Sequence, residues 1–129
     1  MHMTTVKTKV AEITVEEDGI LFMTFNETNI EVSLDDAKEI ISVRKGLPMT
    51  NGKQLIIVDL TSNPNSSLDA KNHGKSEEFA EITTAMALLV DGYMSKFIGN
   101  FFLGFDKPNY HVKLFSDKAS AKKWLLGFK

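Results

Sequence analysis

The sequence predicts an α/β fold with a mixed, mostly parallel central sheet, and three observations support this class. Two apolar runs, 55–58 and 85–90, have no polar interruption, which is typical of strands covered on both faces. Segments with helical spacing of apolar residues separate the strand patterns. The resulting alternation of strands and helices indicates a parallel sheet with helical crossovers. A chain of 129 residues is long enough for one such domain.

The chain begins with a predicted β-hairpin. Residues 10–15 and 20–25 are short strand patterns, and Asp18-Gly19 supplies the turn between them. A further short strand is expected at 30–32. Residues 1–9 are assigned to an N-terminal tail and residues 10–129 to a single domain. With later strands at 55–59, 85–90 and 111–115, the central sheet should contain four to five strands.

Four helices are predicted, at 34–46, 68–81, 93–105 and 117–126. Ser33 can cap the first helix, and Asp35 and Asp36 favour the positive end of its dipole. Arg44 is the one charged residue in the apolar stripe of this helix. The stripe comprises Leu34, Ala37, Ile40, Ile41, Arg44 and Leu47.

The composition excludes several classes of protein. A net charge of −2 gives no electrostatic basis for binding nucleic acid. The absence of cysteine excludes disulfides, thiolate nucleophiles and Cys-based zinc sites. Glu77 follows His73 by four residues, which is typical of a surface pair, and none of the three histidines has a convincing set of ligand partners, so no metal or cofactor is expected. No apolar stretch is long enough to span a bilayer, and the N-terminus has no signal-peptide pattern. We expect a cytoplasmic protein.

Five segments resemble the STAS domain, the fold of the anti-sigma-factor antagonists. They are EEDGILFMTF (16–25), LDDAKEII (34–41), IIVDLTS (56–62), ALLVDGYMSKFIGNFFLGFDKP (87–108) and VKLFSDKASAKKWL (112–125). Their sequences most resemble those of the small SpoIIAA-like branch, also described as STAS/SEC14-like. The resemblance implies a non-catalytic regulatory or protein-interaction module, and the SEC14-like side of the family implies lipid or another small apolar ligand.

The resemblance directs attention to loop 61–69. In STAS antagonists a strand ends in an Asp, and the following loop presents a Ser that a kinase phosphorylates. Here Asp59 ends the strand, and Ser66 and Ser67 lie near the expected place, with Asp69 close behind. The family pattern has Asp directly before the serine and Gly soon after, whereas this chain has Asn65 and Leu68-Asp69. These serines are therefore either a phosphorylation site for a protein partner or helix caps and turn residues.

The predicted helix 93–105 has a heavy apolar face. Its members recur at helical spacing and are Met94, Phe97, Ile98, Phe101, Phe102 and Phe105. This face either covers the sheet or binds an apolar small molecule, a membrane surface or a partner. A homodimer formed through it is a further alternative.

An enzyme is the third functional hypothesis. No nucleophile elbow, phosphate-binding loop or dinucleotide fingerprint is present. Asp59, Asp69 and His73 could meet at the carboxyl edge of the sheet, with Ser66 or Ser67 between them. Because no catalytic signature supports this cluster, no catalytic residues are assigned.

Overall fold

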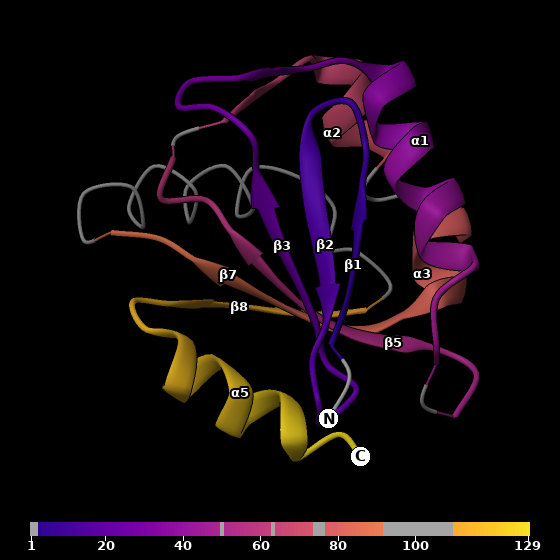
Figure 1. Cartoon of the computed structure of the whole chain (residues 1–129), viewed down its shortest axis with the longest axis vertical. Coiled ribbons are helices and arrows are strands. Elements are labelled where there is room, and N and C mark those ends of the chain that lie inside the picture. The colour runs from indigo at the N-terminus through magenta and orange to yellow at the C-terminus, as the bar shows by residue number, and fades with distance from the viewer. Residues whose placement is uncertain (1–2, 50, 63, 74–76, 92–109) are drawn as a thin grey trace.

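The computed structural model describes residues 3–49, 51–62, 64–73, 77–91 and 110–129 (Figure 1). The central strands are β1 (Thr4–Lys7), β2 (Ala11–Val15), β3 (Leu21–Phe25), β5 (Gln54–Asp59), β7 (Thr83–Leu89) and β8 (His111–Phe115). They form one sheet in the order β1-β2-β3-β5-β7-β8. β2 runs antiparallel to both of its neighbours, β1 and β3, whereas β3, β5, β7 and β8 run parallel to one another. The predicted mixed, mostly parallel α/β fold is confirmed.

The sheet has six strands, rather than the four to five that the sequence predicts. The additional strand is β1, which lies within the predicted tail 1–9 and pairs antiparallel with β2 from Thr4↔Val15 to Lys7↔Glu12. Val6 is the one aliphatic residue of this strand. An edge strand takes its backbone hydrogen bonds from a neighbour, so it forms without the apolar alternation that would reveal it in a sequence.

The short strand expected at 30–32 exists, but it lies outside the central sheet. It is β4 (Glu31–Val32), which pairs in parallel with β6 (Asn65–Ser66) in a separate two-stranded sheet. This pairing joins the segment before the first helix to the loop after β5.

The described helices are α1 (Leu34–Lys45), α2 (Leu68–His73), α3 (Glu77–Ile82) and α5 (Lys118–Leu126). α1 and α5 agree with the predictions 34–46 and 117–126 to within one residue. α2 lies within the predicted helix 68–81 and α3 overlaps its end, while residues 74–76 lie outside the described residues. None of the helices in the described part of the chain is long and apolar enough to span a membrane.

Each face of the sheet carries its own apolar core. On one face, residues such as Ile13, Met23 and Ile56 pack with Ile40 of α1 and Phe79 of α3. On the other face, residues of β5 and β7 pack against α5; they include Ile57, Ala87, Ala121 and Leu125. Figure 1 shows α1 and α3 on one side of the sheet and α5 on the other. The first core lies beneath the loop that the sequence analysis singles out.

Candidate functional site

Backbone hydrogen bonds hold loop 61–69 in place. The Asn29 N–H donates to the Ser62 carbonyl at 2.8 Å, and the Asn65 N–H donates to the Ile30 carbonyl at 2.8 Å. The Ser67 N–H donates to the Val32 carbonyl at 3.0 Å. The loop backbone is therefore anchored to the 29–32 segment at three points.

The structure separates the four residues that the sequence places at this site. Asp59 ends β5, and its Oδ1 accepts hydrogen bonds from the Thr61 N–H at 2.9 Å and the Thr61 hydroxyl at 2.6 Å. This carboxylate therefore stabilises its own turn. Ser67 is exposed, and its Oγ accepts a hydrogen bond from the Ala70 N–H at 3.1 Å, which caps α2. Asp69 is exposed on the first turn of α2.

Ser66, unlike the other three residues, lines a pocket between the sheet and the helices. The pocket has a volume of about 150 Å³. Its apolar lining includes Met23 of β3, Val32 of β4 and Ile40 of α1. Ala70 of α2 and Phe79 of α3 close it from the helical side, together with Ala37 and Ile41. Six elements, from β3 to α3, therefore contribute residues to one small apolar pocket beside the loop.

His73, the last residue of α2, also lines this pocket. Its Nε2 atom is buried and has no hydrogen-bond partner. The structure thus brings together Ser66 and His73, as the enzyme hypothesis requires. However, because Nε2 has no partner, it does not accept a proton from the Ser66 hydroxyl, and Asp59 is engaged by Thr61. His73 Nε2 therefore does not form the hydrogen bond to a serine hydroxyl that activates a nucleophile.

A buried cation lies next to the pocket. Arg44 of α1 is fully buried, and its guanidinium carbon lies 4.7 Å from the centre of the Phe79 ring. Its Nε donates to the Gln54 Oε1 at 2.9 Å, and its Nη2 donates to the Thr83 hydroxyl at 2.8 Å. Burial lowers the pKa of Arg44 to about 10, although the interaction with Tyr110 acts to raise this pKa. Burial also raises the pKa of Tyr110, and the nearby Arg44 charge opposes this shift.

The sequence contained one signal for this arrangement. Arg44 falls in the apolar stripe of the predicted helix 34–46, where a charged side chain is unusual unless it is hydrogen-bonded. Gln54 and Thr83 begin β5 and β7, so the network joins α1 to the amino ends of two neighbouring parallel strands. The pocket residues gave no such signal, because an aliphatic residue beside a pocket has the same pattern as one in a filled core.

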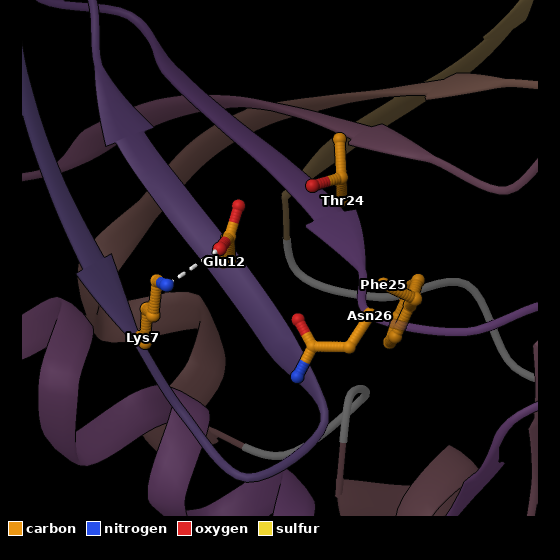
Figure 2. A pocket seen from close by; sticks show the side chains of 5 residues that line it. All are labelled: Lys7, Glu12, Thr24, Phe25 and Asn26. Carbon is orange, nitrogen blue, oxygen red and sulfur yellow. Dashed lines mark ion pairs between the residues drawn. The ribbon is translucent and has the colours of Figure 1, made fainter.

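A second hollow, of about 330 Å³, lies over the β1–β3 part of the sheet and is lined by Lys7, Glu12, Thr24, Phe25 and Asn26 (Figure 2). Lys7 and Glu12 form an ion pair at 3.4 Å there, and both side chains are exposed. An exposed pair of this kind contributes little binding or stability. We therefore place the candidate site at the apolar pocket and its loop.

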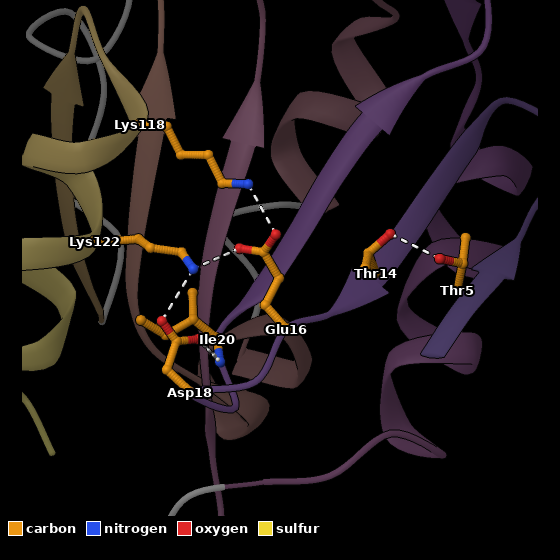
Figure 3. Close-up of polar contacts among 7 residues, drawn as sticks. All are labelled: Thr5, Thr14, Glu16, Asp18, Ile20, Lys118 and Lys122. Atoms are coloured by element: carbon orange, nitrogen blue, oxygen red, sulfur yellow. Dashed lines mark hydrogen bonds and ion pairs between the residues drawn. The ribbon is translucent and has the colours of Figure 1, made fainter. Parts of the chain in front are cut away.

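Charged residues connect the hairpin to α5 on the opposite face (Figure 3). Glu16 lies between Lys118 and Lys122, each with its Nζ 2.8 Å from a Glu16 carboxylate oxygen. Lys122 also contacts Asp18 at 3.0 Å. Burial raises the pKa of Glu16, but the hydrogen bonds and charges of the two lysines outweigh it and leave that pKa below its usual value. This cluster is structural, because it fixes α5 to the turn of the hairpin.

The aromatic face expected on helix 93–105 lies outside the described residues. This concerns Met94, Phe97, Ile98, Phe101, Phe102 and Phe105. Among the residues that the structure describes, no group of three His, Asp or Glu side chains could hold a metal ion.

Comparison with a solved structure identifies the class of fold. The chain is similar to an uncharacterized protein of the DUF3478 family from Shewanella loihica PV-4, which has a SpoIIAA-like fold. The TM-score is 0.58 at 15% sequence identity, over 96% of this chain and 92% of that one. The molecule is therefore an α/β protein with a SpoIIAA-like fold, which confirms the resemblance seen in the sequence.

A family model then identifies the family. The model of a domain of unknown function, DUF7793, matches residues 13–129. The chain belongs to this family. No curated protein matches the sequence.

Proposed function

We propose that this protein is a non-catalytic interaction module that binds a partner protein through loop 61–69 and α2. The exposed side chains there include Asn65, Ser67, Leu68 and Asp69, and we call these four the loop surface. The loop backbone is anchored at Ser62, Asn65 and Ser67, so a partner would meet a preformed surface rather than order a free loop.

Leu68 is the observation that carries this proposal. It is 63% exposed, the largest exposure among the described large hydrophobic residues, and it sits among polar neighbours. Burial of this apolar side chain on association would release water, while its polar neighbours could stay hydrated at the rim of the interface.

Ser67 is the residue through which phosphorylation would control this surface. It is exposed, whereas Ser66 is half-buried and lines the pocket. A phosphate on Ser67 would change the hydroxyl that caps α2 and would add negative charge near Asp69. We expect modification to weaken partner binding, because it places negative charge next to Leu68 on the loop surface.

The experiment compares proteins retained from host extract by the wild-type protein and by two leucine variants. Leu68→Asp should lose a retained protein, because it places a charge at the centre of the loop surface. Leu126→Asp is the matched control, since Leu126 is 43% exposed on α5, on the other side of the sheet. This control should retain the protein, and circular dichroism should show both variants folded. Identical retention by wild type and Leu68→Asp would contradict the proposal.

Two further measurements separate the alternatives. Sedimentation velocity of the purified chain tests self-association, and a dimer that Leu68→Asp dissociates would replace the protein partner by a second copy. Mass spectrometry under denaturing conditions, on protein purified from its host, detects covalent phosphate. A phosphate that disappears in Ser67→Ala supports the switch, whereas a phosphate retained in Ser67→Ala excludes Ser67 as its site.

A further inference from the structure

The pocket beside the loop has the size and lining of a small-molecule site. Its volume is about 150 Å³, which equals that of an engineered protein cavity lined by Leu, Ile and Phe that binds benzene. Two of the elements that line it are held in place: β3 is hydrogen-bonded in the central sheet, and α1 is capped at its N-terminus. A molecule entering this pocket would find Ile40, Ile41 and Phe79 already in place.

The pocket lining also contains two polar residues, one of which has an atom without a hydrogen-bond partner. His73 Nε2 is buried without a hydrogen-bond partner, and Ser66 is the second polar residue of the lining. A buried polar atom without a hydrogen-bond partner is unfavourable. A ligand that hydrogen-bonds to Nε2 would recover this free energy, which gives the pocket a preference that apolar walls alone cannot provide.

We propose that this pocket binds a small molecule with an apolar body about the size of one benzene ring and a single hydroxyl group. The body would lie between Ile40, Ile41 and Phe79, and the hydroxyl would form a hydrogen bond with His73 Nε2. A hydroxyl suits this nitrogen in either imidazole tautomer, since it both donates and accepts. The inference goes beyond the proposed partner function, because it uses the pocket rather than the exposed residues of the loop surface.

Phenol and benzene are the probes for the test, with binding followed by NMR of protein carrying labelled isoleucine methyl groups. We expect saturable shifts of the Ile40 and Ile41 methyl signals with phenol. The Ile57 signal should stay unchanged, because Ile57 belongs to the core on the opposite face. Benzene should bind about tenfold more weakly, the effect of one lost hydrogen bond.

Three variants test the assigned roles. His73→Phe should weaken phenol binding about tenfold and remove the preference for phenol over benzene. His111→Phe should leave binding unchanged, since His111 is exposed and packs against the Phe128 ring 4.9 Å away. Ala70→Leu should abolish binding of both probes by filling the pocket.

Two outcomes would overturn the inference. One is the absence of saturable Ile40 and Ile41 shifts in wild-type protein up to the phenol concentration at which it begins to unfold. The other is equal binding of phenol and benzene by the wild-type protein. This comparison uses the wild-type protein alone, so it does not depend on whether a variant folds. A positive result leaves the proposed partner function to its own test, because Leu68→Asp does not alter the pocket lining.

Discussion

At the scale of single residues, Arg44 shows how a buried charge is accommodated in this fold. The guanidinium is held by the side chains of Gln54 and Thr83 and by the face of the Phe79 ring. Gln54 also donates to the Arg44 carbonyl at 2.6 Å, so its amide bridges the end of α1 and the start of β5. This network fixes the register between a helix and two strands, a specificity that an aliphatic residue could not provide.

Arg44→Ala should lower the free energy of unfolding by about 3 kcal/mol, because it leaves Gln54 and Thr83 buried without their partner. Urea unfolding followed by circular dichroism measures the change. Lys45→Ala is the matched control, since its ion pair with Glu78 at 3.0 Å is exposed, and it should cost less than about 1 kcal/mol. A loss below about 1 kcal/mol for Arg44→Ala would contradict a structural role for the network.

Glu16 predicts a pH dependence of stability. Its folded-state pKa lies below the usual 4.5, so the unfolded chain binds the proton more tightly than the folded one. The stabilisation by this carboxylate is therefore fully present above pH 4.5 and is lost as the pH falls through the folded-state pKa.

Glu16→Gln should accordingly be less stable than wild type at pH 7, and the difference should shrink towards zero as the pH falls below 4.5. Urea unfolding at a series of pH values measures this difference. Glu17→Gln is the control at the neighbouring exposed position, and its profile should follow that of wild type. A difference that grows on acidification would have the wrong sign for the ion pairs with Lys118 and Lys122.

At the scale of elements, local signals predicted most boundaries. The Asp18-Gly19 turn forms as expected, with Gly19 at φ 83°, a backbone conformation that favours glycine. Ser33 and Asp36 form a reciprocal capping box at α1, with distances of 3.1 and 3.0 Å. Such turns and caps are made by residues within a few positions of one another, so they are visible in the sequence. β1 was missed, because its pairing with β2 carries no local pattern.

Ser33→Ala should lower the free energy of unfolding by about 1 kcal/mol, through loss of the hydroxyl that accepts the Asp36 N–H. Thermal and urea unfolding measure the change. Ser42→Ala is the matched control on the same helix, because Ser42 is exposed and inside α1. It should change stability by less than about 0.5 kcal/mol. Equal effects of the two substitutions would show that the cap contributes no more than helix propensity.

At the scale of the whole molecule, one sheet supports two cores. Met23, Ile56 and Met86 face α1, while Ile57 and Ala87 face α5. Since these residues alternate along the same strands, neither core can be lost without disturbing the strands that form the other. We therefore expect the described elements to unfold in one cooperative transition.

Trp124 provides the test, since it is the single tryptophan and packs on α5 between the rings of Phe115 and Phe128, 5.6 and 5.0 Å away. Its fluorescence and far-UV circular dichroism should give coincident unfolding curves in urea. Leu125→Ala should shift both curves together, by about 3 kcal/mol, because Leu125 is fully buried. Separate midpoints for the two probes would show that α5 unfolds independently.

The fold class, the hairpin, strands β2, β3, β5, β7 and β8, and helices α1 and α5 could be predicted from the sequence, as could the position of the loop with Ser66 and Ser67. These depend on apolar periodicity and on short-range capping and turn chemistry. The sequence could not predict that β1 joins the sheet, or that Ser66 lines a pocket while Ser67 caps α2. Only the tertiary structure decided these points, and it also decided that His73 Nε2 is left without a partner. The physical reason is that pockets and unpaired atoms arise where distant segments meet, and each segment alone carries the pattern of an ordinary core.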